Sequence, residues 1–278
     1  MDHKTTSQYE FVVRTNERAA EGVWRMTLAS PVAQLIRPGQ FVNIAVPGDG
    51  SHILRIPLSF KHADPEAGTL ELLYAIVGEG TKRLSAMRAG ESSTLLGPCG
   101  NGWRLPRNPR RCLLVAGGIG LPPVLAAARM LADAQIPFDM VVGARTYAMH
   151  VLPDAMDAIA YGENDGPRGY DPDRMVILTT DDGSTAQGVG KKMFATDGME
   201  DLLGTRAYSQ VYTCGPTVMM ACVAGIAAKH GLACQASLER MMGCGFGACS
   251  CCNVELVQGG YALCCQDGPV FDATEVVW

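Results

Sequence analysis

The sequence predicts a protein of three parts: a small antiparallel β-barrel or sandwich, an α/β domain with a parallel sheet, and a short cysteine-rich unit. Short strand-like segments separated by Gly and Pro fill residues 9–103. From residue 111 onward, strands alternate with helices. Six of the eleven cysteines fall between residues 243 and 271. We therefore expect domains at 1–105, 106–236 and 237–278, a division that suits a chain of 278 residues.

The composition argues against several classes of function. The net charge of −5, with no basic run, argues against a nucleic-acid partner. No stretch approaches the ~20 continuous apolar residues of a membrane span, and the first residues, "MDHKTTSQYEF", do not resemble a secretion signal. We therefore expect a cytoplasmic protein, in which thiols stay reduced and a cysteine cluster more often binds metal than forms disulfides.

Four segments of the first part have the composition of β-strands, with Gly and Pro between them. They are 24–28, 40–46, 69–76 and 92–96. Regular short strands with little helix are typical of a small barrel or sandwich.

The second part has the order of a nucleotide-binding fold. "CLLVAGG" is a strand of the fully buried type, and an apolar helix is predicted over 122–132. "PFDMVVGA" and "RMVILTT" are further strands, and "SQVYTCG" precedes a helix predicted over 217–230. Strands that alternate with helices predict a parallel sheet.

The cysteines of the third part have the spacing of a metal site. Cys244, Cys249 and Cys252 form the pattern C-x4-C-x2-C, and another cysteine follows at 264 or 265. This is the plant-type spacing of a [2Fe–2S] cluster, in which four thiolates hold two irons. Ferric iron and sulfide favour soft thiolate donors, which explains the residue type.

Glycines between the cysteines support the same interpretation. Gly243, Gly245 and Gly247 let the backbone approach a cluster, adopt positive φ and point N–H groups at the sulfurs. The alternatives are a structural zinc site or plain buried cysteines. A four-thiolate zinc site usually shows two C-x2-C pairs, and only one is present here.

Two of the cysteines are expected to be bystanders. "NVELVQGGYAL" predicts a hairpin that turns at its Gly-Gly pair and leads back to Cys264 and Cys265. Neighbouring residues of an extended segment face opposite ways, so only one of these two reaches the cluster. Cys251, beside Cys252, is a bystander for the same reason.

Three glycine-rich turns are candidates for binding phosphate. Gly117, Gly118 and Gly120 lie between a strand and a helix, where backbone amides meet a pyrophosphate in other proteins. The turn 214–216 repeats this arrangement, and ligands of open α/β sheets bind at this edge. The segment 78–81 precedes a helix start. Each motif alone is weak, and a tight turn without a ligand is the alternative.

Taken together, the motifs resemble a known family. They are "PGQFVNI", "RIPLSF", "GEGTKRLS", "GPCGNGW", "VAGGIGLPPV", "TTDDGS", "YTCGP" and "ERMMGCGFGAC…CQDGPVF". From about residue 9 to its end, the chain resembles the electron-transfer subunit of class 1B dihydroorotate dehydrogenase, a branch of the ferredoxin–NADP reductase-like flavoproteins. The last motif is the most specific, because the family's fourth ligand shortly precedes "(D/E)GPVF".

The resemblance implies an FAD-binding barrel, an NAD-binding α/β domain and a [2Fe–2S] domain. The cluster ligands it implies are Cys244, Cys249, Cys252 and Cys265. The residues it implies for FAD are Arg55, Pro57, Leu58, Ser59, Tyr74, Gly78, Gly80, Thr81, Pro98, Gly100 and Asn101. Ser59 is expected near the reactive ring edge, 78–81 at the diphosphate, and 98–101 where the pocket closes. The residues it implies for NAD are Gly117, Gly118, Gly120, Thr179, Asp181, Cys214, Gly215 and Pro216.

One position departs from the family pattern. The family has Arg-Pro-Leu-Ser, whose arginine pairs with FAD phosphate. Here Ile56 precedes Pro57 and Arg55 stands one place earlier, which turns its guanidinium to the other face of a strand. Arg55 is therefore weighed equally as a phosphate ligand and as a solvated arginine.

The function that the resemblance implies is electron transfer in pyrimidine biosynthesis. A separate FMN-containing subunit oxidises dihydroorotate, and this chain passes the electrons through its cluster and FAD to NAD⁺. The expected partner makes a hetero-oligomer, a heterotetramer in the family, and no residue of this chain acts as a general acid or base.

Three alternatives remain at this point. One is the small subunit of a ferredoxin-dependent NADP reductase, in which Arg145 meets a 2′-phosphate. Another is a stand-alone NADH reductase that serves a monooxygenase. The third, of a different class, is a zinc-containing module that binds a partner.

Overall fold

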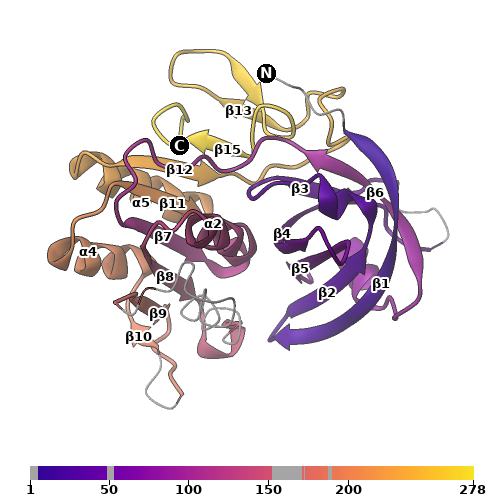
Figure 1. Ribbon diagram of the computed structural model, residues 1–278, viewed down its shortest axis with the longest axis horizontal. Helices are drawn as coiled ribbons and strands as arrows, with labels where there is room; N and C mark the ends of the chain where they lie inside the picture. The colour runs from indigo at the N-terminus through magenta and orange to yellow at the C-terminus, as the bar shows by residue number, and fades with distance from the viewer. Residues whose placement is uncertain (1–5, 49–52, 152–170, 172, 187–189) are drawn as a thin grey trace. The chain divides into compact units, whose positions relative to one another are not determined.

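Figure 1 shows the computed structural model, which describes residues 6–48, 53–151, 171, 173–186 and 190–278. The chain forms two compact units. Their bounds are Met1–Trp103 with Glu239–Val270, and Arg104–Leu238 with Phe271–Trp278. The cysteine-rich segment therefore belongs to the same compact unit as the N-terminal strands, from which it is remote in sequence.

Six strands of the first unit close into an antiparallel barrel, in the order β1-β2-β5-β4-β3-β6 (Figure 1). They are β1 (Ser7–Ala20), β2 (Val23–Ala29), β3 (Phe41–Ile44), β4 (Ile56–Asp64), β5 (Thr69–Ala75) and β6 (Ser92–Cys99). The four predicted strand segments correspond to β2, β3, β5 and β6. β1 and β4 lie outside those segments, and β1 is largely exposed, so it lacks a regular apolar pattern.

The barrel interior is filled by side chains two residues apart. Met26 and Leu28 of β2 and Leu70 and Leu72 of β5 are fully buried. Because successive side chains of a strand face opposite sides, this spacing turns one face inward. Each such side chain stabilises the barrel by about 2 kcal/mol through leaving water. Two short helical segments complete the chain around the barrel, η1 (Pro31–Gln34) and α1 (Glu79–Ser85).

The second unit is a sheet of seven strands in the order β10-β9-β8-β7-β11-β12-β15. The strands are β7 (Cys112–Gly117), β8 (Phe138–Ala144), β9 (Val176–Thr180), β10 (Lys191–Lys192), β11 (Gln210–Cys214), β12 (Ala233–Ser237) and β15 (Val270–Asp272). The helical segments are η2 (Gly118–Gly120), α2 (Leu121–Asp133), η3 (Tyr147–Met149), α4 (Ala195–Thr205) and α5 (Thr217–Lys229). The strands from β10 through β12 pair in parallel, as predicted.

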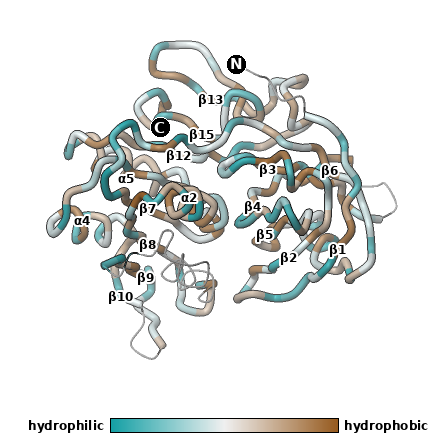
Figure 2. The backbone as a smooth tube through the Cα atoms, in the orientation of Figure 1, coloured by the Kyte–Doolittle hydropathy of each residue, from teal (hydrophilic) through white to brown (hydrophobic). Residues whose placement is uncertain are grey.

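The centre of this sheet is apolar. Every residue of β7 and of β8 is buried, which explains the continuous apolar run of β7 and the apolar residues of β8, where Asp139 is the exception (Figure 2). The predicted helices correspond to α2 and α5 within one residue at each end. The strand order reverses between β7 and β11, which are neighbours. In open α/β sheets, the carboxyl ends of strands at such a switch point form the ligand site.

The cysteine-rich segment contains the predicted hairpin, β13 (Asn253–Glu255) with β14 (Tyr261–Leu263). Its turn holds Gly259 and Gly260, both at positive φ (88° and 81°), where other residues are disfavoured. Within the described residues, no helix has the length and apolar character needed to span a bilayer.

A buried carboxylate on β8 is the centre of a hydrogen-bond network in the second unit. Asp139 of β8 is fully buried, and it accepts hydrogen bonds from Arg111 (3.0 Å), Arg206 (3.1 Å), Tyr208 (2.7 Å) and the Met175 N–H (2.7 Å). Four donors compensate for the loss of hydration that burial of this charge requires.

We predict that Asp139→Asn lowers the free energy of unfolding by about 3 kcal/mol, because it leaves the partly buried Arg206 without this counter-charge and leaves Arg111 with Asp171 as its remaining carboxylate partner. Thermal and urea unfolding followed by circular dichroism measure this loss. Asp133→Asn is the matched control, since its ion pair with Arg129 is exposed on α2 and contributes little. Equal unfolding midpoints for the two variants contradict the assigned role of Asp139.

Candidate cofactor sites

The four predicted cluster ligands form two pairs in the cysteine loop. The N–H of Cys244 donates to the sulfur of Cys249 at 3.4 Å, and the N–H of Cys265 donates to the sulfur of Cys252 at 3.4 Å. Gly245 follows Cys244 directly and has φ 80°, a conformation that favours glycine. N–H groups directed at sulfurs are the environment that iron–sulfur ligands have in proteins.

The loop favours the thiolate of Cys244. Burial raises its pKa, but N–H groups of residues 246, 249 and 248 and the Cys249 side chain more than compensate. As a result, the pKa of Cys244 falls to about 7. A thiolate is the form that binds metal, so the loop is prepared for that role before any ion arrives.

Cys265 and Cys264 differ in their surroundings. Burial raises the pKa of Cys265 to about 12, and its thiol interacts with Cys252, with Cys244 and with the Gly247 N–H. Burial also raises the pKa of Cys264 to about 12, and its sulfur interacts electrostatically with Cys252, Arg240 and Glu239. Cys265 interacts with members of both pairs of the loop, which is compatible with its selection as a ligand.

The donor set fits an iron–sulfur cluster, because it offers soft sulfur donors and backbone N–H groups directed at them. This fit rests on donor type and on the N–H groups, because within the described ranges no three His, Cys, Asp or Glu side chains are grouped so that they could hold a metal ion. Cys251 is exposed beside the buried Cys252, but the predicted ligand Cys249 is exposed as well, so the role of Cys251 as a bystander stays a prediction.

Strand β4 carries the three residues predicted to line the flavin. Pro57, Leu58 and Ser59 are each partly exposed, and they pair with β3. Pro57 lies opposite Asn43, and Ser59 lies opposite Phe41. Cross-strand partners share a face of the sheet, so Asn43 is on the face of Pro57 and Ser59. Asn43 lies in the motif "PGQFVNI", but the sequence analysis assigned it no role.

The turn 78–81 has an internal hydrogen-bond network. The hydroxyl of Thr81 accepts from the N–H groups of Val77 (2.9 Å) and Gly78 (3.2 Å) and donates to the Gly78 carbonyl. Thr81 and Gly80 are buried, whereas Gly78 is exposed with open space where a side chain would stand. The structure therefore uses Thr81 to shape this turn.

The predicted pocket-closing turn anchors the cysteine-rich segment. Asn101 donates from its side-chain amide to the carbonyl of Asp267, and its oxygen accepts from the Val270 N–H at 3.2 Å. Gly100 has φ 68°, and a side chain there would overlap the carbonyl of Gly268. Pro98, which follows a cis peptide bond, is buried in the same turn.

Two predicted flavin residues make contacts within the barrel. The Arg55 guanidinium donates to the Thr94 carbonyl (3.1 Å) and hydroxyl (3.1 Å) and to the Gln8 side chain (3.0 Å). These contacts tie β1 to β6. Tyr74 is buried, and its hydroxyl bonds Asn16 at 2.9 Å. The assignment of both residues to FAD stays a prediction.

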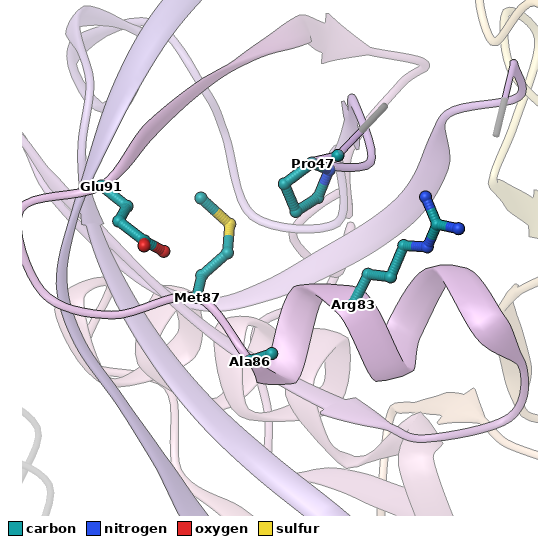
Figure 3. Close-up of a pocket in the computed structure, with 6 residues that line it drawn as sticks. Pro47, Arg83, Ala86, Met87 and Glu91 are labelled. Atoms are coloured by element: carbon teal, nitrogen blue, oxygen red, sulfur yellow. The ribbon is translucent and has the colours of Figure 1, made fainter. Parts of the chain in front are cut away.

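An open hollow of about 400 Å³ lies beside α1 in the same unit (Figure 3). Its lining residues are Pro47, Gly48, Arg83, Ala86, Met87 and Glu91. Arg83 also pairs with Glu79 at 3.1 Å. Of these six residues, only Arg83 lies in a quoted motif, "GEGTKRLS", and the sequence analysis assigned it no role.

The predicted dinucleotide residues lie at the carboxyl edge of the second unit's sheet. Cys214 at the end of β11 pairs with Ala116 of β7, which brings the two glycine-rich turns together. A side chain at Gly120 would overlap the Cys214 carbonyl, so the turns approach too closely for any residue but glycine. A side chain at Gly117 would likewise overlap Pro216 and Met219.

The remaining dinucleotide residues lie along the same edge. Gly118 is exposed at φ 52°, and Gly215 has φ 157°. Thr179, on β9, is fully buried, and its hydroxyl has no hydrogen-bond partner. Asp181 is exposed just after β9. Among the described residues, the edge therefore has glycine turns, the hydroxyl of Thr179 and the carboxylates of Asp181 and Asp182.

Comparison with known proteins defines the class. The iron–sulfur cluster binding domain of dihydroorotate dehydrogenase B matches residues 239–277, and the oxidoreductase NAD-binding domain matches residues 114–225. The chain is thus an oxidoreductase with an iron–sulfur domain and an NAD-binding domain. The prediction of FAD, NAD and an iron–sulfur cluster as cofactors is confirmed, as is the fold class.

Similar proteins define the family. The dihydroorotate dehydrogenase B (NAD(+)) electron transfer subunit of Bacillus caldolyticus is 34% identical over 95% of this chain and 96% of its own. The subunit of Geobacillus thermodenitrificans is 36% identical, covering 93% and 94%. A chain of the NADH-dependent reduced ferredoxin–NADP oxidoreductase structure has a TM-score of 0.80 at 29% identity, covering 96% and 89%. This chain belongs to the family of dihydroorotate dehydrogenase B electron transfer subunits.

We predict that Cys265→Ser greatly lowers the iron and sulfide content of the purified protein, because one of four ligands is weakened. Cys264→Ser is the matched neighbour and retains the cluster, although a buried hydroxyl costs about 1–2 kcal/mol of stability. Iron analysis and visible absorption measure the difference. Cluster loss in Cys264→Ser together with retention in Cys265→Ser reverses the assignment.

We also predict that Cys244 of cluster-free protein reacts with iodoacetamide at a rate that rises through about pH 7. Its lowered pKa gives thiolate at a pH where an ordinary thiol, with a pKa of about 8.5, is mostly protonated. Peptide mass spectrometry across the pH range measures the rate, and urea-unfolded protein is the control. Identical profiles for folded and unfolded chains contradict the role of the loop N–H groups.

Proposed function

We propose that this chain carries electrons from a separate, FMN-containing dihydroorotate dehydrogenase subunit to NAD⁺. Dihydroorotate loses two electrons and two protons to become orotate, and NAD⁺ gains a hydride while one proton is released. When bound, a [2Fe–2S] cluster would exchange single electrons, and FAD would combine two of them with a proton and deliver them as a hydride. The single observation that carries this proposal is the cysteine loop packed in one compact unit with the barrel.

The residues have separate roles in this proposal. Cys244, Cys249, Cys252 and Cys265 bind the cluster. Pro57, Leu58 and Ser59 line the flavin, and the turn 78–81 meets its diphosphate. Support comes from the half-exposed positions of the β4 residues and from the open space at Gly78.

The NAD site in this proposal is the carboxyl edge of the second sheet. Gly117, Gly118, Gly120, Cys214, Gly215 and Pro216 approach the dinucleotide, and Thr179 and Asp181 contact its polar groups. The adjacent turns at the strand-order switch support this assignment. We further propose functional domain boundaries at 1–105, 106–236 and 237–278.

The proposed partner is the catalytic subunit in a heterotetramer, and the proposed location is the cytoplasm. Reduced thiols suit that location, since none of the eleven cysteines forms a disulfide. No basic residue pattern calls for a nucleic acid.

A second candidate function is the small subunit of a ferredoxin-dependent NADP reductase. The similarity to the NADH-dependent reduced ferredoxin–NADP oxidoreductase structure favours it, at a TM-score of 0.80. Arg145 follows β8 and is exposed, where it offers a cation to a 2′-phosphate. Asp181 and Asp182 lie across from it on the loop after β9 and favour NAD⁺ instead, because carboxylates repel that phosphate.

We predict that the chain, copurified with a catalytic dihydroorotate dehydrogenase subunit, reduces NAD⁺ with dihydroorotate and uses NADP⁺ poorly. Formation of NADH at 340 nm and of orotate in equal amounts is the measurement. A catalytic subunit alone is the control, and it should not reduce NAD⁺. A colourless chain that contains zinc and no flavin contradicts the proposal, and a preference for NADP⁺ with ferredoxin favours the second candidate.

A further inference from the structure

Asn43 is a polar residue in an apolar part of the barrel wall. It lies within β3 between two fully buried neighbours, Val42 and Ile44, and is itself 0% exposed. Its backbone pairs with Pro57 of β4 on one side and with Leu96 of β6 on the other. An amide buried without full hydrogen bonding costs about 1–3 kcal/mol. An apolar residue of similar volume would avoid that cost, so the amide requires an explanation.

The donor half of the amide contacts the cysteine loop. Nδ2 of Asn43 donates to the carbonyl of Cys244 at 3.1 Å. Gly245 follows directly, and a side chain there would overlap the same Nδ2. The carbonyl of the first cluster ligand and the next glycine are therefore both shaped around one side chain of the barrel wall.

The acceptor half of the amide is unsatisfied. Oδ1 of Asn43 is buried and has no hydrogen-bond partner among the residues that the structure describes. Buried polar atoms in folded proteins are nearly always paired, so an unpaired acceptor of this kind marks a place for a donor. Asn43 shares its face with Pro57 and Ser59, which are the residues of the proposed flavin strand.

Neighbouring groups hold this contact in place. Arg55 donates to the Thr94 carbonyl at 3.1 Å, and its Nη1 lies 3.5 Å from the Asn43 carbonyl. Cys99, the last residue of β6, is buried. Arg55 thus links β3 to β6, and Asn43 holds the peptide of Cys244 against β3.

We propose that Asn43 is a positioning residue for electron transfer between the cluster and the flavin. Its N–H group fixes the Cys244 peptide on the strand pair that carries Pro57 and Ser59, and its free oxygen accepts a hydrogen bond from a ring N–H of the flavin. One amide therefore links both cofactors of the unit. This inference rests on the proposed function, because it assumes that both cofactors bind.

The test uses Asn43→Leu, which keeps the approximate volume and removes both hydrogen-bonding groups. We expect the protein to keep its FAD and its iron, and the midpoint potential of the cluster to shift. We expect the rate at which NADH reduces the cluster to fall about fivefold, the factor for one hydrogen bond. EPR-monitored redox titration and anaerobic stopped-flow absorption measure these two quantities in the full chain.

The control is Asn16→Leu. Asn16 is a second amide of the barrel, and it binds Tyr74 and the carbonyls of Leu84 and Met87, away from the cysteine loop. The Asn16→Leu variant should also be less stable than wild type, yet the midpoint potential of its cluster should remain at the wild-type value. A shift of equal size in both variants shows that general loosening of the barrel, and not position, moves the potential, and this overturns the inference.

Gly245→Ala tests the same contact from the loop side, because the new methyl group displaces Nδ2. We expect the midpoint potential of the cluster to shift in Gly245→Ala. In the double variant Asn43→Leu/Gly245→Ala, the shift should be smaller than the sum of the two single shifts, as for residues that act through one contact. Additive effects overturn the inference. The proposed function is tested separately, by iron and flavin analysis of the wild-type protein before any variant is compared. Wild-type protein that contains neither iron nor flavin contradicts the proposed function itself.

Discussion

The whole cofactor arrangement depends on the return of residues 239–270 to the barrel wall. Asn43 holds the start of this segment at the Cys244 carbonyl, and Asn101 holds its end at Asp267 and Val270. Both amides belong to the barrel, on β3 and just after β6. Electron transfer over short distances requires fixed positions, and these two anchors supply that rigidity at both ends of a loop that has little regular structure of its own.

The loop between the two anchors has little regular secondary structure, and its backbone groups interact with the cysteine sulfurs. N–H groups that would otherwise pair in strands point at sulfurs instead, and this lowers the pKa of Cys244 to about 7 despite the effect of burial. Cys265 behaves differently, since burial raises its pKa to about 12, and metal binding must displace its proton. The loop therefore offers one thiolate that forms readily and one that forms only when the metal binds.

Much of the fold and of the site was predictable because the motifs are local. Strands β7 and β11, helices α2 and α5 and the hairpin turn at Gly259-Gly260 follow from short patterns of apolar residues and glycine. Asn43 was not predictable, because its meaning comes from a contact with Cys244, which is 201 residues away. The family resemblance assigns Asn101 to the flavin site, yet its side-chain hydrogen bonds are made with the cysteine-rich segment. Long-range pairing of this kind leaves no spacing in the sequence.

The most direct test of this account asks whether flavin and cluster exchange electrons inside one isolated chain. Excess NADH is added anaerobically to the purified chain without a partner, and the spins of the reduced cluster are counted by EPR. The account predicts a signal approaching one [2Fe–2S] centre per chain. A fully reduced flavin beside a cluster that stays silent, although dithionite reduces it, contradicts the claim that barrel and cysteine loop form one electron-transfer unit.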